Sequence, residues 1–431
     1  LLCGLGMIFA PWLIRFIAPG FAIESRPLLI ELTRIMFLSP FILGISSIVG
    51  SVLQSQRRFF VYSLSPIFYN MGIIVGALLL APKYGIIGLA WGVVMGSAAH
   101  LLIQIPTLWG LGFRYQRLFQ WRDKGVISIF KMMSARTFGL AVTQINLMVI
   151  TVIASTLTAG SLTVFNLANN LQTFPVSIFG ISFALAVFPL MAAAPTNEKI
   201  IELFSRTFRH ILFFIIPAMV VIVSLRAQIV RLILGSGKFD WNATTLTMDT
   251  LAFFALSLFA QAALPLLTRS FYAQHDSRTP LYTGLAAEAA NVTLSIYFAR
   301  KWGAPGLALG FSLSSILNFI LLFVFLRRKL GALDEFKIFK AVAKYSAAAI
   351  LAALAIQAMK LLVWPYTDLT RFWGVALQAI SAGGFGTLVY LGTCSLLRSE
   401  EFLELWTAAK TRLLKPWKKF KADDQSEARG I

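Results

Sequence analysis

The stretch YGIIGLAWGVVMGSA at residues 84–98 is repeated, with substitutions, as WGAPGLALGFSLSSI at residues 302–316. In this alignment the small residues correspond in order, which pairs Gly88, Gly92 and Gly96 with Gly306, Gly310 and Ser314. Small residues spaced four apart line one face of a helix and let a neighbouring helix approach closely, as happens between membrane helices. The repeat therefore predicts two related bundles of membrane-spanning helices in one chain.

The offset that separates Gly88 from Gly306 also relates other short segments. It pairs Phe21 of IAPGF with Phe239 of GSGKF and Gln56 of LQSQRRFF with Gln274 of FYAQHDSRTP, while Arg15 and Arg231 match at nearly the same offset. Collinear matches of this kind are typical of an internal repeat. The second copy begins near Gly125 and includes two apolar stretches, 131–156 and 162–193, for which the first copy has no counterpart. We therefore expect roughly ninety further residues, with two helices, ahead of Leu1.

Composition places the chain in a lipid bilayer. Of its 431 residues 58% are hydrophobic and 13% charged, and the mean hydropathy is +0.77. A soluble globular protein needs far more polar surface than this. A helix that crosses about 30 Å of hydrocarbon needs roughly 20 apolar residues. Twelve stretches meet this requirement: 1–18, 28–53, 60–81, 84–110, 131–156, 162–193, 205–225, 244–268, 280–299, 304–326, 341–363 and 372–397.

These stretches predict an all-α polytopic membrane protein with two pseudo-symmetric six-helix lobes and a C-terminal two-helix hairpin. Because the first lobe lacks its first two helices, twelve of fourteen spans are expected here. The expected parts are a truncated first lobe at 1–118, a second lobe at 125–329, a transmembrane hairpin at 341–397 and a basic amphipathic tail at 398–431. Two related bundles side by side favour a transporter whose lobes move against each other.

The formal net charge of +20 raises the question of nucleic-acid binding, but the basic residues are scattered among short loops, which argues against it. If residues 19–28 face outward, the inner loops and the tail hold 24 Lys and Arg residues and the outer loops hold 9. This asymmetry predicts a cytoplasmic C-terminus. In the tail, Phe402 and Trp406 lie at helical spacing opposite cations such as Lys418, which predicts a helix that rests on anionic membrane lipids. A solvated extension is the alternative.

No arrangement of residues indicates an enzyme. His100, His210 and His275 lie far apart without the spacing of metal ligands, and no glycine-rich phosphate loop follows a strand. The sequence therefore predicts neither a catalytic site, a metal site nor a cofactor.

Polar side chains inside the apolar stretches are the candidate functional residues. A charge at bilayer depth costs at least about 2.5 kcal/mol and usually faces a cavity or a partner. Arg136, Gln144 and Asn146 lie in the fifth stretch, and Asn169 and Asn170 lie in the sixth. We expect these five residues to line a substrate cleft. The alternatives are that Arg136 extends to the membrane surface and that the asparagines bond neighbouring helices.

Five strings in the chain resemble one known family: APGF at 18–21, QIN at 144–146, FPVSIFGISFALAVFPLMA at 174–192, GKFD at 237–240 and RSFYAQHDSRTP at 269–280. In this order they resemble the MurJ (MviN) group of the multidrug/oligosaccharidyl-lipid/polysaccharide exporter superfamily. The last string is the most specific, since it is similar to the family pattern R-x-FYA-x-x-D-T-[RK]-TP. It marks Arg269, Asp276 and Arg278 as a motif loop.

This resemblance implies fourteen helices and a lipid II flippase of the bacterial inner membrane. Such a protein moves the undecaprenyl-pyrophosphate-linked peptidoglycan precursor from the cytoplasmic to the outer leaflet. The resemblance also implies an apolar groove at the terminal hairpin for the polyprenyl tail, cleft cations for the pyrophosphate, and cell-wall synthases as protein partners. Two alternatives stay open: an exporter of another polyprenyl-linked glycan or amphiphile, and a non-transporting scaffold for cell-wall assembly.

The chain departs from the family pattern in the sixth stretch. Where the family has ADRL-x-[EQ]-FP, this chain has ANNLQTFP, so that Asn170 replaces an arginine. Arg136, one span earlier, is our candidate for the missing charge.

A second departure lies in the coupling-cation site that the resemblance implies. Asn291 matches a polar position of that site, whereas Ser295 replaces an acidic residue. Asn146 and Ser312 are the other residues expected to contribute oxygen ligands to the cation. Oxygen ligands without a carboxylate hold a monovalent cation weakly. A monovalent cation, protons and the membrane potential therefore all stay open as energy sources.

Overall fold

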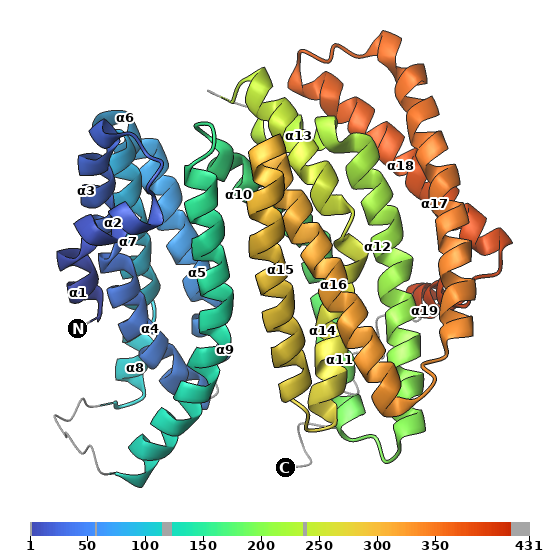
Figure 1. The fold of residues 1–431 in the computed structure, drawn as a ribbon, viewed down its shortest axis with the longest axis horizontal. Coiled ribbons are helices and arrows are strands. Elements are labelled where there is room, and N and C mark those ends of the chain that lie inside the picture. The colour runs from blue at the N-terminus through green and yellow to red at the C-terminus, as the bar shows by residue number, and fades with distance from the viewer. Residues whose placement is uncertain (1, 57, 114–122, 236–238, 415–431) are drawn as a thin grey trace. The chain divides into compact units, whose positions relative to one another are not determined.

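The computed structural model describes residues 2–56, 58–113, 123–235 and 239–414, although some side chains within 124–143 and 408–414 are not described. In these ranges the chain is helical apart from short connections, and it contains no strand (Figure 1). It divides into two compact units, Leu1–Thr156 and Leu157–Ile431. The expected all-α membrane fold is confirmed.

The helices of the first unit are α1 (Leu2–Ile8), α2 (Ala10–Ile17), the short η1 (Ile23–Ser25), α3 (Arg26–Met36), α4 (Leu38–Ser55), α5 (Phe59–Val75), the π-helical η2 (Gly76–Leu80), α6 (Ala81–Tyr84), α7 (Ile86–Leu102), α8 (Ile105–Gly110) and α9 (Lys124–Ser155). Those of the second unit are α10 (Ser161–Pro175), the π-helical η3 (Val176–Ile181), α11 (Ser182–Ala192), α12 (Asn197–Leu234), α13 (Trp241–Ala255), α14 (Leu258–Ala273), α15 (Arg278–Trp302), α16 (Ala304–Leu330), α17 (Glu335–Val363), η4 (Trp364–Tyr366), α18 (Phe372–Leu396) and α19 (Glu400–Leu414).

Side-chain caps fix where several of these helices begin. The Asp123 carboxylate accepts hydrogen bonds from the first backbone N–H groups of α9, at 2.7 Å from Gly125 N. The Asp240 carboxylate does the same for α13, at 2.8 Å from Ala243 N. Such caps satisfy N–H groups that have no partner inside the helix.

All twelve apolar stretches expected from the sequence are helical in the structure. Among the described residues, eight helices are long and apolar enough to cross a membrane, or nine if the bent pair α13 and α14 counts as one span. The total of twelve spans and the expected lobe boundaries stay predictions. The first compact unit runs to Thr156 and thus includes α9, where Gly20 N donates a hydrogen bond to Ser155 Oγ at 3.4 Å.

The repeated stretch forms the same local structure in both units. Gly85, before α7, has φ 59° and ψ −141°, and Gly303, before α16, has φ 61° and ψ −134°. Only glycine adopts this backbone conformation readily. A Cβ atom on Gly88 would lie 2.5 Å from Leu80 O, and one on Gly306 would lie 2.2 Å from Phe298 O. The two helical hairpins, one in each unit, are therefore packed alike.

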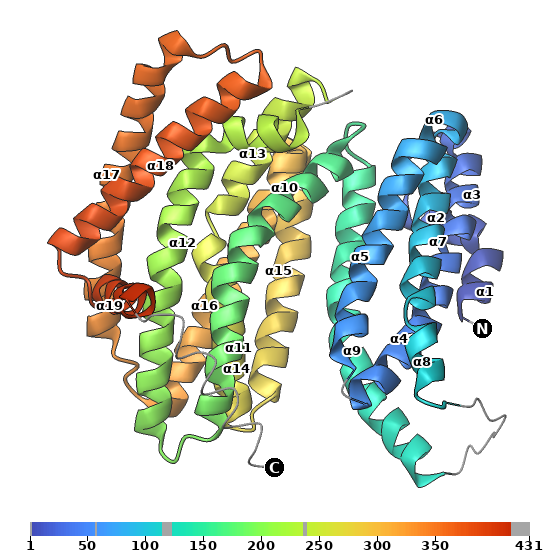
Figure 2. The ribbon, with the colours of Figure 1, turned by 180° about the vertical axis from the view of Figure 1, so that it is seen from behind.

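The terminal hairpin of α17 and α18 packs against α12 in the second unit (Figure 2). The Tyr390 hydroxyl donates to Phe213 O at 2.8 Å, and Gln228 Nε2 donates to Gln378 Oε1 at 2.8 Å. Both contacts lie in the interior, where an unpaired polar group would be costly. These two hydrogen bonds hold the hairpin to α12 at two positions along that helix.

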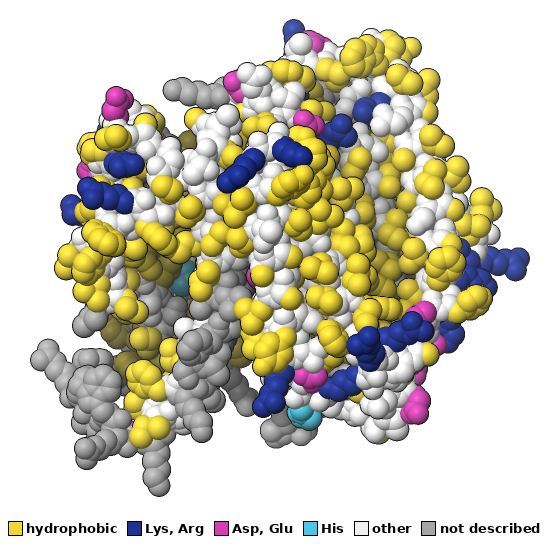
Figure 3. Space-filling view, viewed as in Figure 1, with side chains coloured by type: hydrophobic (Ala, Val, Ile, Leu, Met, Phe, Trp, Pro, Cys, Tyr) yellow, Lys and Arg dark blue, Asp and Glu magenta, His cyan; other side chains and the backbone are white. Residues whose placement is uncertain are grey.

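The predicted tail helix is observed as α19 as far as Leu414, and the remainder of the tail lies outside the described residues. It is held to α12 by ion pairs, with Arg206 Nη2 3.0 Å from Glu404 Oε2 and Arg209 Nη1 2.8 Å from Glu400 Oε2. On the face of the second unit drawn in Figure 3, apolar side chains cover the middle, and Lys and Arg side chains gather mostly toward the ends. This pattern suits a protein surrounded by lipid.

Candidate functional site

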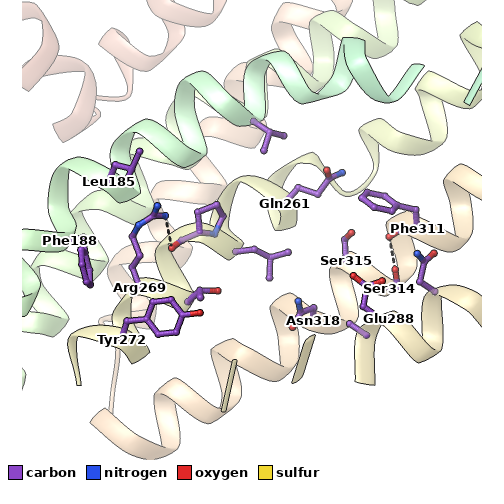
Figure 4. A pocket seen from close by; sticks show the side chains of 16 residues that line it. Leu185, Phe188, Gln261, Arg269, Tyr272, Glu288, Phe311, Ser314, Ser315 and Asn318 are labelled. Carbon is purple, nitrogen blue, oxygen red and sulfur yellow. Dashed lines mark hydrogen bonds between the residues drawn. The ribbon is translucent and has the colours of Figure 1, made fainter. Parts of the chain in front are cut away.

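The second unit contains a cavity of about 700 Å³ between α11, α14, α15 and α16, with a mostly apolar wall that also carries polar and charged side chains (Figure 4). Apolar side chains such as Leu185 and Phe188 form part of its wall. The polar and charged lining consists mainly of Gln261, Arg269, Glu288, Asn291, Ser315 and Asn318. A cavity with few polar groups among apolar ones is typical of a ligand site.

Arg269, which belongs to the predicted motif loop, lies near the end of α14 and reaches the cavity. Its Nη1 donates to Pro265 O at 3.3 Å, and among the described residues it forms no ion pair. A guanidinium has five N–H donors, so a single contact with a carbonyl leaves donors available to an anion. Arg269 is therefore the anion-binding candidate of this cavity.

The other end of the cavity is rich in oxygen atoms. Glu288 lies there beside Ser314, Ser315 and Asn318, well apart from Arg269 (Figure 4). Asn318 Oδ1 is buried without a hydrogen-bond partner in the described part of the chain. A buried acceptor of this kind is uncommon in proteins. The two ends of the cavity thus differ in chemistry, one offering donors and the other acceptors.

A chain of buried and half-buried hydrogen bonds lies beside the cavity, where α13 and α14 meet at 46°. Gln261 Nε2 donates to Gln172 Oε1 at 2.7 Å and to Ser257 Oγ at 2.8 Å. Gln172 Nε2 in turn donates to Asn169 Oδ1 at 2.9 Å, and Ser257 Oγ donates to Ser312 Oγ at 2.9 Å. The network thereby joins α10, α14 and α16 across the bend.

This network connects two predicted site residues, Asn169 and Ser312, through three residues that the sequence analysis missed. A signal for one of them was present, because the offset of the repeat pairs Ser257 with Ser39. In the first unit Ser39 Oγ forms a buried hydrogen bond with Ser97 Oγ at 2.5 Å. A search of the repeat for paired polar residues would have found this position.

The predicted cleft residues do not form one cluster within either unit. Gln144 is exposed and Asn146 buried on α9 of the first unit, whereas Asn169 and Asn170 lie on α10 of the second. Asn169 is bonded within the network, and Asn170 is exposed. The side chain of Arg136 lies outside the described residues, so its role stays a prediction.

Two groups of the residues proposed to hold a coupling cation form hydrogen bonds with different helices. Ser295 Oγ donates to Asn291 Oδ1 at 3.1 Å within α15, and both side chains are buried. Ser312 instead faces α13, where its Oγ donates to Phe253 O at 2.8 Å. The cation site stays a prediction.

The motif loop between α14 and α15 is held by Asp276. Its Oδ1 accepts from Arg278 N at 3.1 Å and from Thr279 N at 3.0 Å, and its Oδ2 accepts from Lys329 Nζ of α16 at 2.9 Å. The hydrogen bond from Lys329, together with that from the Thr279 N–H, lowers the pKa of Asp276 to about 2. Arg278 is exposed. Asp276 therefore ties the start of α15 to the end of α16 and does not line the cavity.

An apolar groove of about 770 Å³ lies elsewhere in the second unit, between α12, α14, α16 and α17. Its walls are almost entirely hydrocarbon, and they include Phe208, Leu212, Phe319, Phe323, Phe339 and Val342. One wall of the groove is formed by α17 of the terminal hairpin, the hairpin at which the resemblance implies a groove for the polyprenyl tail. A surface of this kind accommodates an apolar chain.

Comparison with known proteins places the chain in a family. The family model described as "Lipid II flippase MurJ" matches residues 1–374. A probable lipid II flippase MurJ of Haemophilus influenzae is 30% identical over 366 residues, which cover 80% of this chain and 70% of that protein. One of Vibrio cholerae is 27% identical over 400 residues, covering 90% and 74%. One of Buchnera aphidicola subsp. Baizongia pistaciae is 26% identical over 325 residues, so that this chain spans 63% of its length.

Solved structures agree with this result at the level of the fold. A lipid II flippase MurJ in an inward closed conformation superposes with a TM-score of 0.75 at 23% identity, covering 93% of this chain and 80% of that one. An inward-facing multidrug resistance transporter of the MATE family superposes with a TM-score of 0.63 at 15% identity, covering 77% and 78%. With its many apolar helices, the chain is a multi-pass bacterial membrane protein. It belongs to the family of the lipid II flippase MurJ.

Proposed function

We propose that this protein is a flippase that moves lipid II from the cytoplasmic to the outer leaflet of the bacterial inner membrane by alternating access. The observation that carries the proposal is the presence, in one unit, of a cavity whose Arg269 forms no ion pair with any described residue and of a separate apolar groove. Relatives named lipid II flippase match most of the chain, which supports the choice of substrate. On this proposal the protein transports its substrate and catalyses no covalent reaction.

The two sites suit the two parts of such a substrate. A polyprenyl tail is apolar and remains beside hydrocarbon at little cost, and the groove formed by α12, α16 and α17 offers such a surface. The pyrophosphate and sugars need water and hydrogen-bond donors during passage. Arg269 supplies donors of the kind that bind phosphate oxygens.

The energy source proposed is a monovalent cation or the membrane potential. The acceptor-rich end of the cavity, where Glu288 and Asn291 lie with an Asn318 Oδ1 that has no partner among the described residues, offers oxygen ligands to a cation. Binding there would help drive transport if the affinity for the cation differs between the inward and outward states. Titrating the transport rate with sodium at fixed pH and fixed potential distinguishes these sources.

The proposed orientation puts the C-terminus in the cytoplasm. The excess of Lys and Arg in the inner loops supports it. The tail then meets the anionic leaflet on that side, and cell-wall synthases would act on the product outside. Labelling of single cysteines placed in the tail and in the loop at 364–371, with a reagent that cannot cross the membrane, tests the orientation.

The function is tested by reconstituting the protein in vesicles with fluorescent lipid II and measuring how fast the head group reaches the other leaflet. We expect Arg269→Gln to slow transport roughly 10- to 100-fold, because a hydrogen bond with a charged partner contributes about 1.5–3 kcal/mol. The matched control is Arg300→Gln, which removes an exposed cation at the far end of α15. Wild-type vesicles that do not move lipid II, under conditions where they move another polyprenyl-linked glycan, would contradict the choice of substrate.

A further inference from the structure

A second polar cavity of the second unit lies where α12, α17 and α19 meet, and it has a volume of about 310 Å³. This is at the lower end of the range of about 300–1,000 Å³ for small-ligand pockets. Four cations and two carboxylates line it: Arg209, Lys337, Lys340, Lys344, Glu400 and Glu401. The charged lining thus has an excess of positive charge.

Both carboxylates are already paired. Arg209 Nη1 lies 2.8 Å from Glu400 Oε2 and 2.5 Å from Glu401 Oε1. Glu401, with a side chain only 4% exposed, also accepts from Ser399 Oγ at 3.0 Å. A carboxylate so buried requires a partner, which the guanidinium provides. Arg209 thus offsets one of the two negative charges and one lysine suffices to offset the other, so the charged lining keeps two positive charges in excess.

The lysines remain incompletely bonded. Lys344 Nζ donates to the uncharged carbonyl Arg398 O at 3.1 Å, and Lys337 forms an exposed pair with Asp334 at 3.3 Å. Lys340 is exposed and forms no ion pair in the described part of the chain. An ammonium group has three donors, so Lys340 and Lys344 together offer several to a ligand. Their spacing of four residues places them on one face of α17.

The cavity lies at the level expected for lipid head groups. It is formed by the first three turns of α17, the start of α19 and Arg209 of α12, close to where the apolar part of α17 begins, and α19 lies across α12 and α17 (Figures 1 and 2). Phe336 borders the cavity, and it and Trp406 of α19 are exposed. Aromatic side chains are enriched at this depth of a membrane.

We propose that this cavity binds the phosphate of an anionic phospholipid, with Lys340 and Lys344 donating hydrogen bonds to the phosphate oxygens. Lipid is favoured over a soluble anion because the exposed Phe336 borders the cavity at the start of α17, a helix long and apolar enough to cross a membrane. The site is separate from the apolar groove, whose residues Phe339, Val342 and Ser346 lie on a different face of α17. It is therefore independent of the proposed transport site.

The proposal is tested by native mass spectrometry of the protein taken from vesicles of phosphatidylcholine alone or mixed with phosphatidylglycerol. Wild-type protein is expected to retain phosphatidylglycerol selectively. Each cation near an anionic lipid contributes about fivefold in affinity. The double variant Lys340→Gln, Lys344→Gln should therefore lose roughly 30-fold.

The control is the double variant Lys199→Gln, Lys301→Gln, which removes the same charge at exposed positions outside the cavity. It should bind phosphatidylglycerol as the wild type does, and Lys340→Arg should retain binding. Equal loss in both double variants would overturn the proposal, because it would show a general effect of net charge. Displacement of phosphatidylglycerol by inorganic phosphate would assign the cavity to a soluble anion and overturn the choice of lipid.

Discussion

Substitution of Gly306 by alanine tests whether the repeated stretch sets the packing of the second helical hairpin. The added Cβ atom would lie 2.2 Å from Phe298 O and 2.5 Å from Phe298 C, both backbone atoms of α15. Atoms of this kind make ordinary contacts with a Cβ only beyond 3.4 Å. Because no side-chain rotation relieves a clash with backbone, α15 and α16 must move apart by about 1 Å.

The expected loss of stability in Gly306→Ala is measured against a control substitution in the same hairpin. Gly284 lies within α15, and a Cβ atom there would meet nothing within 4 Å. Alanine is preferred to glycine in a helix by up to about 1 kcal/mol, so Gly284→Ala should be neutral or stabilising. Overpacking costs about 1–3 kcal/mol. The free energy of unfolding of Gly306→Ala should therefore fall below that of Gly284→Ala by about 1–3 kcal/mol.

The measurement is the thermal unfolding of purified protein in detergent, with both variants compared to the wild type. The first unit offers an independent pair, because a Cβ atom on Gly88 would clash with Leu80 O whereas one on Gly44 would meet nothing within 4 Å. Gly88→Ala should also destabilise relative to its control. If Gly306→Ala and Gly284→Ala unfold at the same temperature, the close packing inferred for the hairpin is wrong.

Three further substitutions test the ionic contacts. Asp276→Asn should lower the free energy of unfolding by about 1 kcal/mol at neutral pH, a modest value because Lys329 is 37% exposed. Since the pKa of Asp276 is lower in the folded than in the unfolded protein, this stabilisation is present above about pH 4 and is lost toward pH 2. The unfolding curves of the wild type and the variant should therefore converge on acidification. Arg209→Gln should destabilise the protein by about 3 kcal/mol because it leaves the buried Glu401 without its cation. The control Arg206→Gln, at a position 59% exposed, should change stability by less than about 1 kcal/mol. Equal effects of the two substitutions in chemical unfolding would contradict the conclusion that Glu401 depends on Arg209.

Much of the fold could be predicted because membrane helices carry a strong local signal. A run of roughly 20 apolar residues has few structures open to it in a bilayer, so the twelve stretches were assigned correctly as helices. The glycines of the repeat were equally informative, since Gly88 and Gly306, which the repeat pairs, both lie close to the backbone of the segment before them in their hairpin.

The cavity was harder to predict because its residues come from four helices. Glutamine at 172 and 261 is unremarkable in the sequence, and only the fold shows that the two amides are bonded to each other. Similarly, Glu288 and Asn318 lie far apart in the sequence and become neighbours through the hairpin of α15 and α16. Such partnerships depend on helix rotation, which is set by packing between helices.

The motif at residues 269–280 illustrates how one short segment contributes both to the cavity and to the structure around it. Arg269 lies in the cavity wall on α14, whereas Asp276 binds the first N–H groups of α15 and Lys329 near the end of α16. These two helices carry Glu288 and Asn318, the acceptors at the other end of the cavity. Through these bonds Asp276 links the two helices that carry the acceptors of the cavity, seven residues after the arginine that supplies its donors.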